Sequence, residues 1–157
     1  MYSLVQKQQA GVRKLFRLAY DTNAVFMEHG PARPNEVGAC IDHAHLHCLP
    51  NIVPVRQALD KLLGKGHPAT FEDLHRLHSA GESYLFVDDG EAYVFPLDIA
   101  PSQFLRQVVA TAIGHTEWTW QSSRKSDVVR DRFRRTTSKL SPFADELLWA
   151  CAEVTKS

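Results

Sequence analysis

The chain has 157 residues, of which 44% are hydrophobic and 23% are charged, values typical of a compact globular protein. Eighteen basic residues balance eighteen acidic ones, so we do not expect a general coat for nucleic acid, although a local basic patch remains open. The sequence contains no apolar run near the ~20 residues of a membrane-spanning helix, and we expect no membrane contact. Its three cysteines are too scattered for a disulfide framework, which favours a reducing, cytoplasmic location.

The first third of the chain predicts one helix and two strands. Apolar residues recur at helical spacing over residues 3–20, and an apolar run predicts a strand over 23–28. Prolines and glycines over 29–38 predict a loop. Residues 39–49 alternate strictly between polar and apolar side chains, which predicts a second strand that ends at Pro50.

The rest of the chain predicts helices and one hairpin. Thr70, with Asp73 three residues later, can cap a helix, and Asp89-Gly90 is a strong hairpin turn. The expected elements are helices over 55–63, 71–80, 103–113 and 127–139, strands over 83–87 and 91–95, and a last helix from Pro142 toward Val154. This mixture predicts an α+β fold, with a small antiparallel sheet, flanking helices and a C-terminal hairpin and helical lobe.

The most informative residues are His43, His45 and His47. On a strand, side chains two and four residues apart share one face, so the three imidazoles would point the same way. The three histidines could simply form the polar, solvent-facing side of a strand without a chemical role. Two neighbours could chelate a metal ion, although the outer two are ~13 Å apart at Cα. The central imidazole could also attack phosphorus while its neighbours hydrogen-bond the non-bridging oxygens.

The third possibility agrees with a known family. The segment from His43 to Leu49 resembles the histidine-triad (HIT) signature, His-φ-His-φ-His-φ-φ, where φ is an apolar residue, at every position. Softer similarity to a bacterial HIT subgroup with a C-terminal extension lies in four further segments: 26–30, 38–42, 101–106 and 117–120.

The resemblance implies a HIT-like fold and a nucleotide hydrolase or nucleotidyl transferase that needs no cofactor and no metal. By this resemblance, His45 is the nucleophile that forms a covalent nucleotidyl-histidine intermediate. His43 and His47 would bind phosphate and assist the leaving group of a nucleotide or nucleotide conjugate. The substrate-binding residues suggested with it are Gly38, Cys40, Glu28, His29, Gln103 and Arg106.

The resemblance also bears on organisation and partners. It assigns residues 1–64 to the C-terminal part of a HIT domain that carries the triad, and residues 65–157 to a C-terminal extension packed on it. The N-terminal half of the HIT domain is expected to be absent, because Met1 comes almost directly before the first predicted helix. We expect a second copy of the chain to cover the exposed sheet, giving a homodimer. The alternatives are a catalytically weak nucleotide-binding or interaction protein, or a histidine metal-binding protein.

Two further groups have simpler expected roles. Arginines over 130–135 alternate with Asp127 and Asp131, and we expect a solvated, ion-paired helix face rather than a contact to RNA or DNA. His75 and His78 lie three residues apart on a predicted helix, and we expect them to be solvated rather than to hold a metal.

Overall fold

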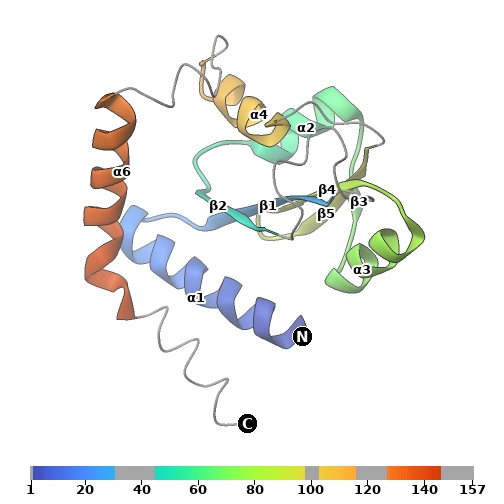
Figure 1. The fold of residues 1–157 in the computed structure, drawn as a ribbon, viewed down its shortest axis with the longest axis horizontal. Coiled ribbons are helices and arrows are strands. Elements are labelled where there is room, and N and C mark those ends of the chain that lie inside the picture. Colours follow the sequence, from blue (N-terminus) through green and yellow to red (C-terminus); the bar gives the residue numbers. More distant parts are fainter. Residues whose placement is uncertain (1, 31–44, 98–102, 116–126, 146–157) are drawn as a thin grey trace. The chain divides into compact units, whose positions relative to one another are not determined.

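The structure, a computed structural model, describes residues 2–30, 45–97, 103–115 and 127–145 (Figure 1). The chain divides into two compact units, Met1–Ala24 with Trp120–Ser157, and Val25–Thr119. The helices of the first unit are α1 (Tyr2–Tyr20), α6 (Asp127–Leu140) and the 3-10 helix η1 (Ser141–Phe143). The other elements are β1 (Ala24–Gly30), β2 (His47–Pro50), α2 (Val55–Leu63), β3 (His67–Pro68), α3 (Phe71–Ala80), β4 (Tyr84–Asp88), β5 (Ala92–Pro96) and α4 (Phe104–Ala112). Among these helices, none has the length and apolar character needed to cross a membrane.

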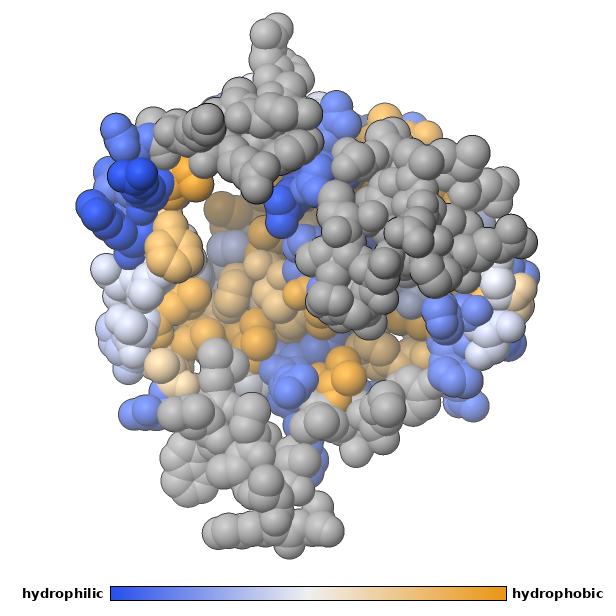
Figure 2. Space-filling view, in the orientation of Figure 1, coloured by the Kyte–Doolittle hydropathy of each residue, from blue (hydrophilic) through white to orange (hydrophobic). Residues whose placement is uncertain are grey.

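The first unit combines the N-terminal segment of the chain with its C-terminal segment. Arg17 of α1 donates to the side chain of Asn23 over 2.7 Å, which fixes the turn that follows the helix. α6 contacts α1, and the Nζ atom of Lys139 lies 4.7 Å from the ring centroid of Tyr20. Hydrophilic residues gather along α6, at the left of the space-filling view (Figure 2). The buried side chains of α1 include those of Leu15, Phe16 and Ala19.

The second unit is built on a sheet that has five strands in the described part of the chain, in the order β2-β1-β4-β5-β3. β1 runs antiparallel to β4, and β5 runs antiparallel to both β4 and β3. β4 and β5 form the predicted hairpin, in which Gly90 has a φ of 125° that favours glycine. These helices and this sheet confirm the predicted α+β class.

Different helices cover the two faces of the sheet. One apolar cluster contains Val25 of β1, Leu59 of α2 and Leu105 of α4. The other contains Phe86 of β4 and Leu74 of α3. Because neighbouring residues of a strand point to opposite faces, β4 and β5 contribute residues to both clusters. We call the two sides the α2/α4 face and the α3 face.

The helix ends follow the predicted local signals. α2 ends at Leu63 before Gly64, which has a φ of 85°. Thr70 and Asp73 form a capping box, in which the Asp73 amide donates to the Thr70 hydroxyl over 3.3 Å and the Thr70 amide donates to the Asp73 carboxylate over 2.8 Å. These bonds satisfy amide groups that have no partner within the first helical turn.

β1 is longer than predicted. His29 and Gly30 continue the strand and pair with β4, so the loop predicted over 29–38 is wrong at its first two residues. Gly30 lies opposite Tyr84 in the register, and a Cβ atom at this position would collide with the tyrosine ring. The glycine therefore allows close packing inside a strand here rather than marking a turn.

Two short strands also differ from prediction. β2 covers only the end of the strand predicted over 39–49, since residues 45–46 precede it and 39–44 lie outside the described residues. β3 was not predicted, and its two residues pair with β5. Asp60 of α2 fixes the connection to β3, because its carboxylate accepts from the Gly66 amide over 3.2 Å and from the Lys65 ammonium over 3.1 Å.

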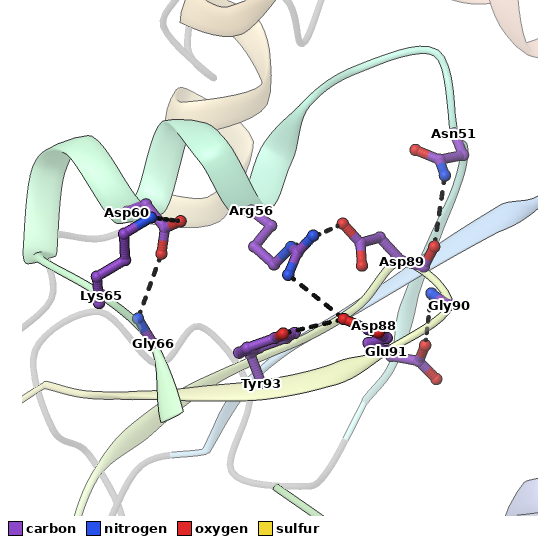
Figure 3. A network of polar contacts seen from close by, with 10 residues as sticks. All are labelled: Asn51, Arg56, Asp60, Lys65, Gly66, Asp88, Asp89, Gly90, Glu91 and Tyr93. Atoms are coloured by element: carbon purple, nitrogen blue, oxygen red, sulfur yellow. Dashed lines mark hydrogen bonds and ion pairs between the residues drawn. The ribbon is translucent and has the colours of Figure 1, made fainter. Parts of the chain in front are cut away.

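Arg56 links α2 to the hairpin turn (Figure 3). Its Nε atom donates to the Asp89 carboxylate over 3.0 Å, and its guanidinium carbon lies 4.5 Å from the ring centroid of Tyr93. The Tyr93 hydroxyl donates in turn to Glu91 over 3.0 Å. A single cation thereby holds a helix and a turn that are about thirty residues apart in the sequence.

The domain boundary expected between residues 64 and 65 stays a prediction. Strands from both sides of it belong to one sheet, since β1 and β2 precede the boundary and β3, β4 and β5 follow it.

Candidate histidine site

His45 and His47 lie side by side at the edge strand β2. Their ring centroids are 4.9 Å apart with an interplanar angle of 78°, an edge-to-face arrangement. Leu49 packs against the apolar cluster of the α2/α4 face, whereas Leu46 packs against the cluster of the α3 face. His47, two residues before Leu49, therefore shares the α2/α4 face, and the ring of His45, which precedes β2, contacts the ring of His47.

The opposite faces of Leu46 and Leu49 agree with the predicted alternation, whereas His45 precedes β2 and its place on a common strand with His47 stays a prediction. His43 lies outside the described residues, as do Gly38 and Cys40.

Arg106 contributes positive charge to this site from the first turn of α4. The pKa of His47 is lowered by burial, then by the positive charge of His45 and of Arg106. His47 is therefore neutral near pH 7, a state in which one ring nitrogen donates a hydrogen bond and the other accepts one. Gln103 precedes α4 as its N-cap, in the left-handed region with a φ of 64°. The charge of Arg106 thus acts on His47, whereas the substrate-binding roles predicted for Arg106 and Gln103 stay predictions.

The two candidates on β1 lie on different faces of the sheet. Glu28 is opposite Phe86 in the register and points to the α3 face, whereas His29 is opposite Leu85 and points to the α2/α4 face. Of the two, His29 shares a face with His47.

Burial raises the pKa of the Glu28 carboxyl, and the positive charges of His45 and His78 act against this shift. Glu28 thus interacts electrostatically with the proposed nucleophile and with α3. Sequence reasoning missed His78, because only the packing of α3 on the sheet lets its charge act on Glu28.

The thiol of Cys48 lies on the same strand. Burial raises its pKa, and its Sγ atom donates to the Leu46 carbonyl over 3.7 Å. The protonated thiol is a weak nucleophile. In the described segment from His45 to Cys48, the imidazoles of His45 and His47 are therefore the better nucleophiles.

Within the described residues, no group of three or more His, Cys, Asp or Glu side chains is arranged to hold a metal ion. An open depression of about 540 Å³ on α3 is lined by none of the histidine-row residues. Its lining residues are Thr70, Glu72, Asp73, His75, Arg76 and Ser79.

No family model, curated protein or solved structure matches this chain. Membership of the HIT family, expected from the segment His43–Leu49, therefore stays a prediction.

Proposed function

We propose that the chain is a HIT-type nucleotide hydrolase or nucleotidyl transferase. The observation that carries this proposal is the contact between the imidazoles of His45 and His47 at the start of β2, with ring centroids 4.9 Å apart. Such a pair can place a nucleophile and a hydrogen-bond donor on the same phosphate group.

The reaction has two steps at the α-phosphorus. A neutral ring nitrogen of His45 attacks phosphorus, the bond to the leaving group breaks, and the leaving group departs with the bonding electron pair and takes up a proton. Water or an acceptor molecule then attacks the phosphorus of the nucleotidyl-histidine, and the P–N bond breaks to regenerate the imidazole. His43 and His47 donate hydrogen bonds to the non-bridging oxygens as their negative charge increases.

The electrostatics around His47 support this assignment of roles. Because its pKa is lowered, His47 has a neutral ring near pH 7, which can donate a hydrogen bond to a phosphate oxygen from one ring nitrogen and accept one at the other. Arg106 supplies the permanent positive charge beside it, suited to a phosphate oxygen.

Replacement of His45 by Ala tests the proposal. We expect loss of hydrolysis of nucleoside phosphoramidates and dinucleoside polyphosphates by about 10³-fold or more. His47→Ala should cost less, about 10²–10³-fold, because it removes one hydrogen bond to the developing charge. His75→Ala is the matched control, since His75 is exposed on α3 and lies outside the row.

Rapid quench with labelled substrate, followed by mass spectrometry, should detect an acid-labile, base-stable nucleotide on His45. Turnover by the wild-type protein with no adduct at any time would exclude covalent catalysis. Nucleotide binding without turnover would favour the weak binding or interaction protein instead, and stoichiometric metal in the purified protein would favour the metal-binding alternative.

We propose in addition that the protein works in the cytoplasm as a homodimer in which a second copy covers the sheet beside β2. β2 ends the strand order of the described sheet, and edge strands are normally covered or paired. Multi-angle light scattering should give twice the chain mass of 17.7 kDa. A stable monomer over a wide concentration range would contradict this.

A further inference from the structure

The zero net charge of the chain conceals a strong separation of charge between the two compact units. Twelve of the eighteen Lys and Arg residues, but only six of the eighteen Asp and Glu residues, lie in Met1–Ala24 and Trp120–Ser157. The difference of these counts gives this unit a formal charge of +6, and the remainder, Val25–Thr119, a formal charge of −6. The first unit is thus a basic module, which the composition of the whole chain does not reveal.

Helix α6 concentrates this charge around an exposed aromatic ring. Phe133 is 72% exposed, and Arg132 and Arg134 are its neighbours in the sequence. At about 3.6 residues per turn, these arginines project on either side of the phenylalanine. Val129 lies one turn before Phe133 and is also exposed. The helix therefore presents a ring flanked by two cations.

The acidic residues of α6 are already engaged with other arginines. Asp131 accepts from Arg135 over 2.8 Å, and Asp127 lies 3.8 Å from Arg130. Within the described residues, Arg132 forms no ion pair. These pairs agree with the expectation of an ion-paired helix, but they leave an excess of cations beside the exposed ring.

α1 adds to the positive charge instead of balancing it. Its sequence contains Lys7, Arg13, Lys14 and Arg17 and no acidic residue, and it contacts α6 within the same unit. Two cationic helices side by side repel each other, and an anionic ligand would relieve that repulsion.

The charge and the exposed apolar residues of α6 distinguish between three possible ligands: a second copy of the chain, a bilayer and nucleic acid. A second copy of the basic unit would bring like charges together, which argues against pairing of α6 with α6 of another copy. A bilayer would require a broader apolar face, whereas α6 exposes Val129 and Phe133 among charged side chains and threonines. Single-stranded nucleic acid offers both phosphates for the arginines and bases that stack on an aromatic ring.

We propose that α6 is the centre of a binding surface for single-stranded nucleic acid, with Phe133 stacking on a base and Arg132 and Arg134 contacting phosphates. This surface belongs to a different compact unit from the histidine row, and the proposal does not depend on the proposed function. The His45→Ala variant should therefore retain full affinity for the nucleic acid.

Fluorescence anisotropy with a labelled, mixed-sequence single-stranded RNA tests the proposal, and an RNA of about 16 nucleotides is long enough for one such site. We expect saturable binding that weakens between about 50 and 200 mM salt. The double variant Arg132→Gln/Arg134→Gln should bind more weakly, and the slope of log affinity against log salt should become shallower by about 1.4, since each phosphate contact contributes about 0.7.

Phe133→Ala should weaken binding roughly tenfold, and Phe133→Trp should restore it, because the loss of one base stack accounts for an effect of this order. The charge-matched control Lys61→Gln/Arg76→Gln removes two exposed cations from the other unit and should leave the affinity unchanged. Circular dichroism should show the same helix content in every variant.

Three results would overturn the proposal. The first is absence of saturable RNA binding by the wild-type chain at low salt. The second is an equal loss of affinity in the Lys61/Arg76 control. The third is binding of polyglutamate or phosphatidylserine vesicles that depends on Phe133 while RNA binding does not, since this would assign the surface to an acidic protein or a membrane.

Discussion

Leu59 provides a sharp test of the packing that holds α4 and its Arg106 over the histidine face. The Leu59 side chain is 0% exposed and belongs to the cluster that joins α2 and α4 to the sheet. Leu62 lies on the same helix three residues later and is 63% exposed. Both residues are leucines of the same helix. Their replacements by alanine therefore differ only in how deeply the lost side chain is buried.

The expected cost follows from the buried volume that is lost. Leu59→Ala removes three carbons, and the transfer of three such groups accounts for about 2.4 kcal/mol. A residual cavity of ~50 Å³ adds about 1.2 kcal/mol at ~24 cal/mol per Å³. The free energy of unfolding should therefore fall by about 3.5 kcal/mol. Leu62→Ala should change it by less than about 0.5 kcal/mol.

Urea unfolding, followed by far-UV circular dichroism, measures the free energy of unfolding of both variants, and thermal unfolding measures their Tm. At roughly 4–8 °C per kcal/mol for a unit of this size, the Tm of Leu59→Ala should fall by about 14 °C or more. Equal losses in the two variants, or a loss below about 1 kcal/mol for Leu59→Ala, would refute the burial of α2 against the sheet.

Three further outcomes are expected. Thr70→Ala removes half of the capping box with Asp73 and should lower the free energy of unfolding by about 1 kcal/mol, whereas Thr70→Ser should cost little. Burial raises the pKa of Glu28. The neutral Glu28 carboxyl is therefore tolerated at low pH, and this contribution to folding stability is lost as pH rises through the raised pKa. Glu28→Gln should accordingly be more favourable relative to wild type at about pH 7 than at about pH 4 in urea titrations, and the opposite trend would contradict the shift. Arg56→Gln breaks the ion pair with Asp89 and should cost less than about 1 kcal/mol, a loss that shrinks in high salt.

The sequence determined the local elements because their signals act over a few residues. Gly64 ends α2, Thr70 and Asp73 cap α3, and Asp89-Gly90 forms the hairpin turn, each within a single turn of the chain. The alternation likewise placed Leu46 and Leu49 on opposite faces of the sheet, since it follows from strand geometry.

The tertiary structure decided what depends on contacts between distant residues. Gly30 belongs to a strand because the ring of Tyr84, more than fifty residues away, packs against it. Glu28 and His29 separate to opposite faces through their register with β4, and His78 reaches Glu28 only through the packing of α3. The basic unit forms because α1 and α6 meet from opposite ends of the chain. Local spacing cannot encode these pairings, because they depend on the order of the strands and on which apolar faces bury each other.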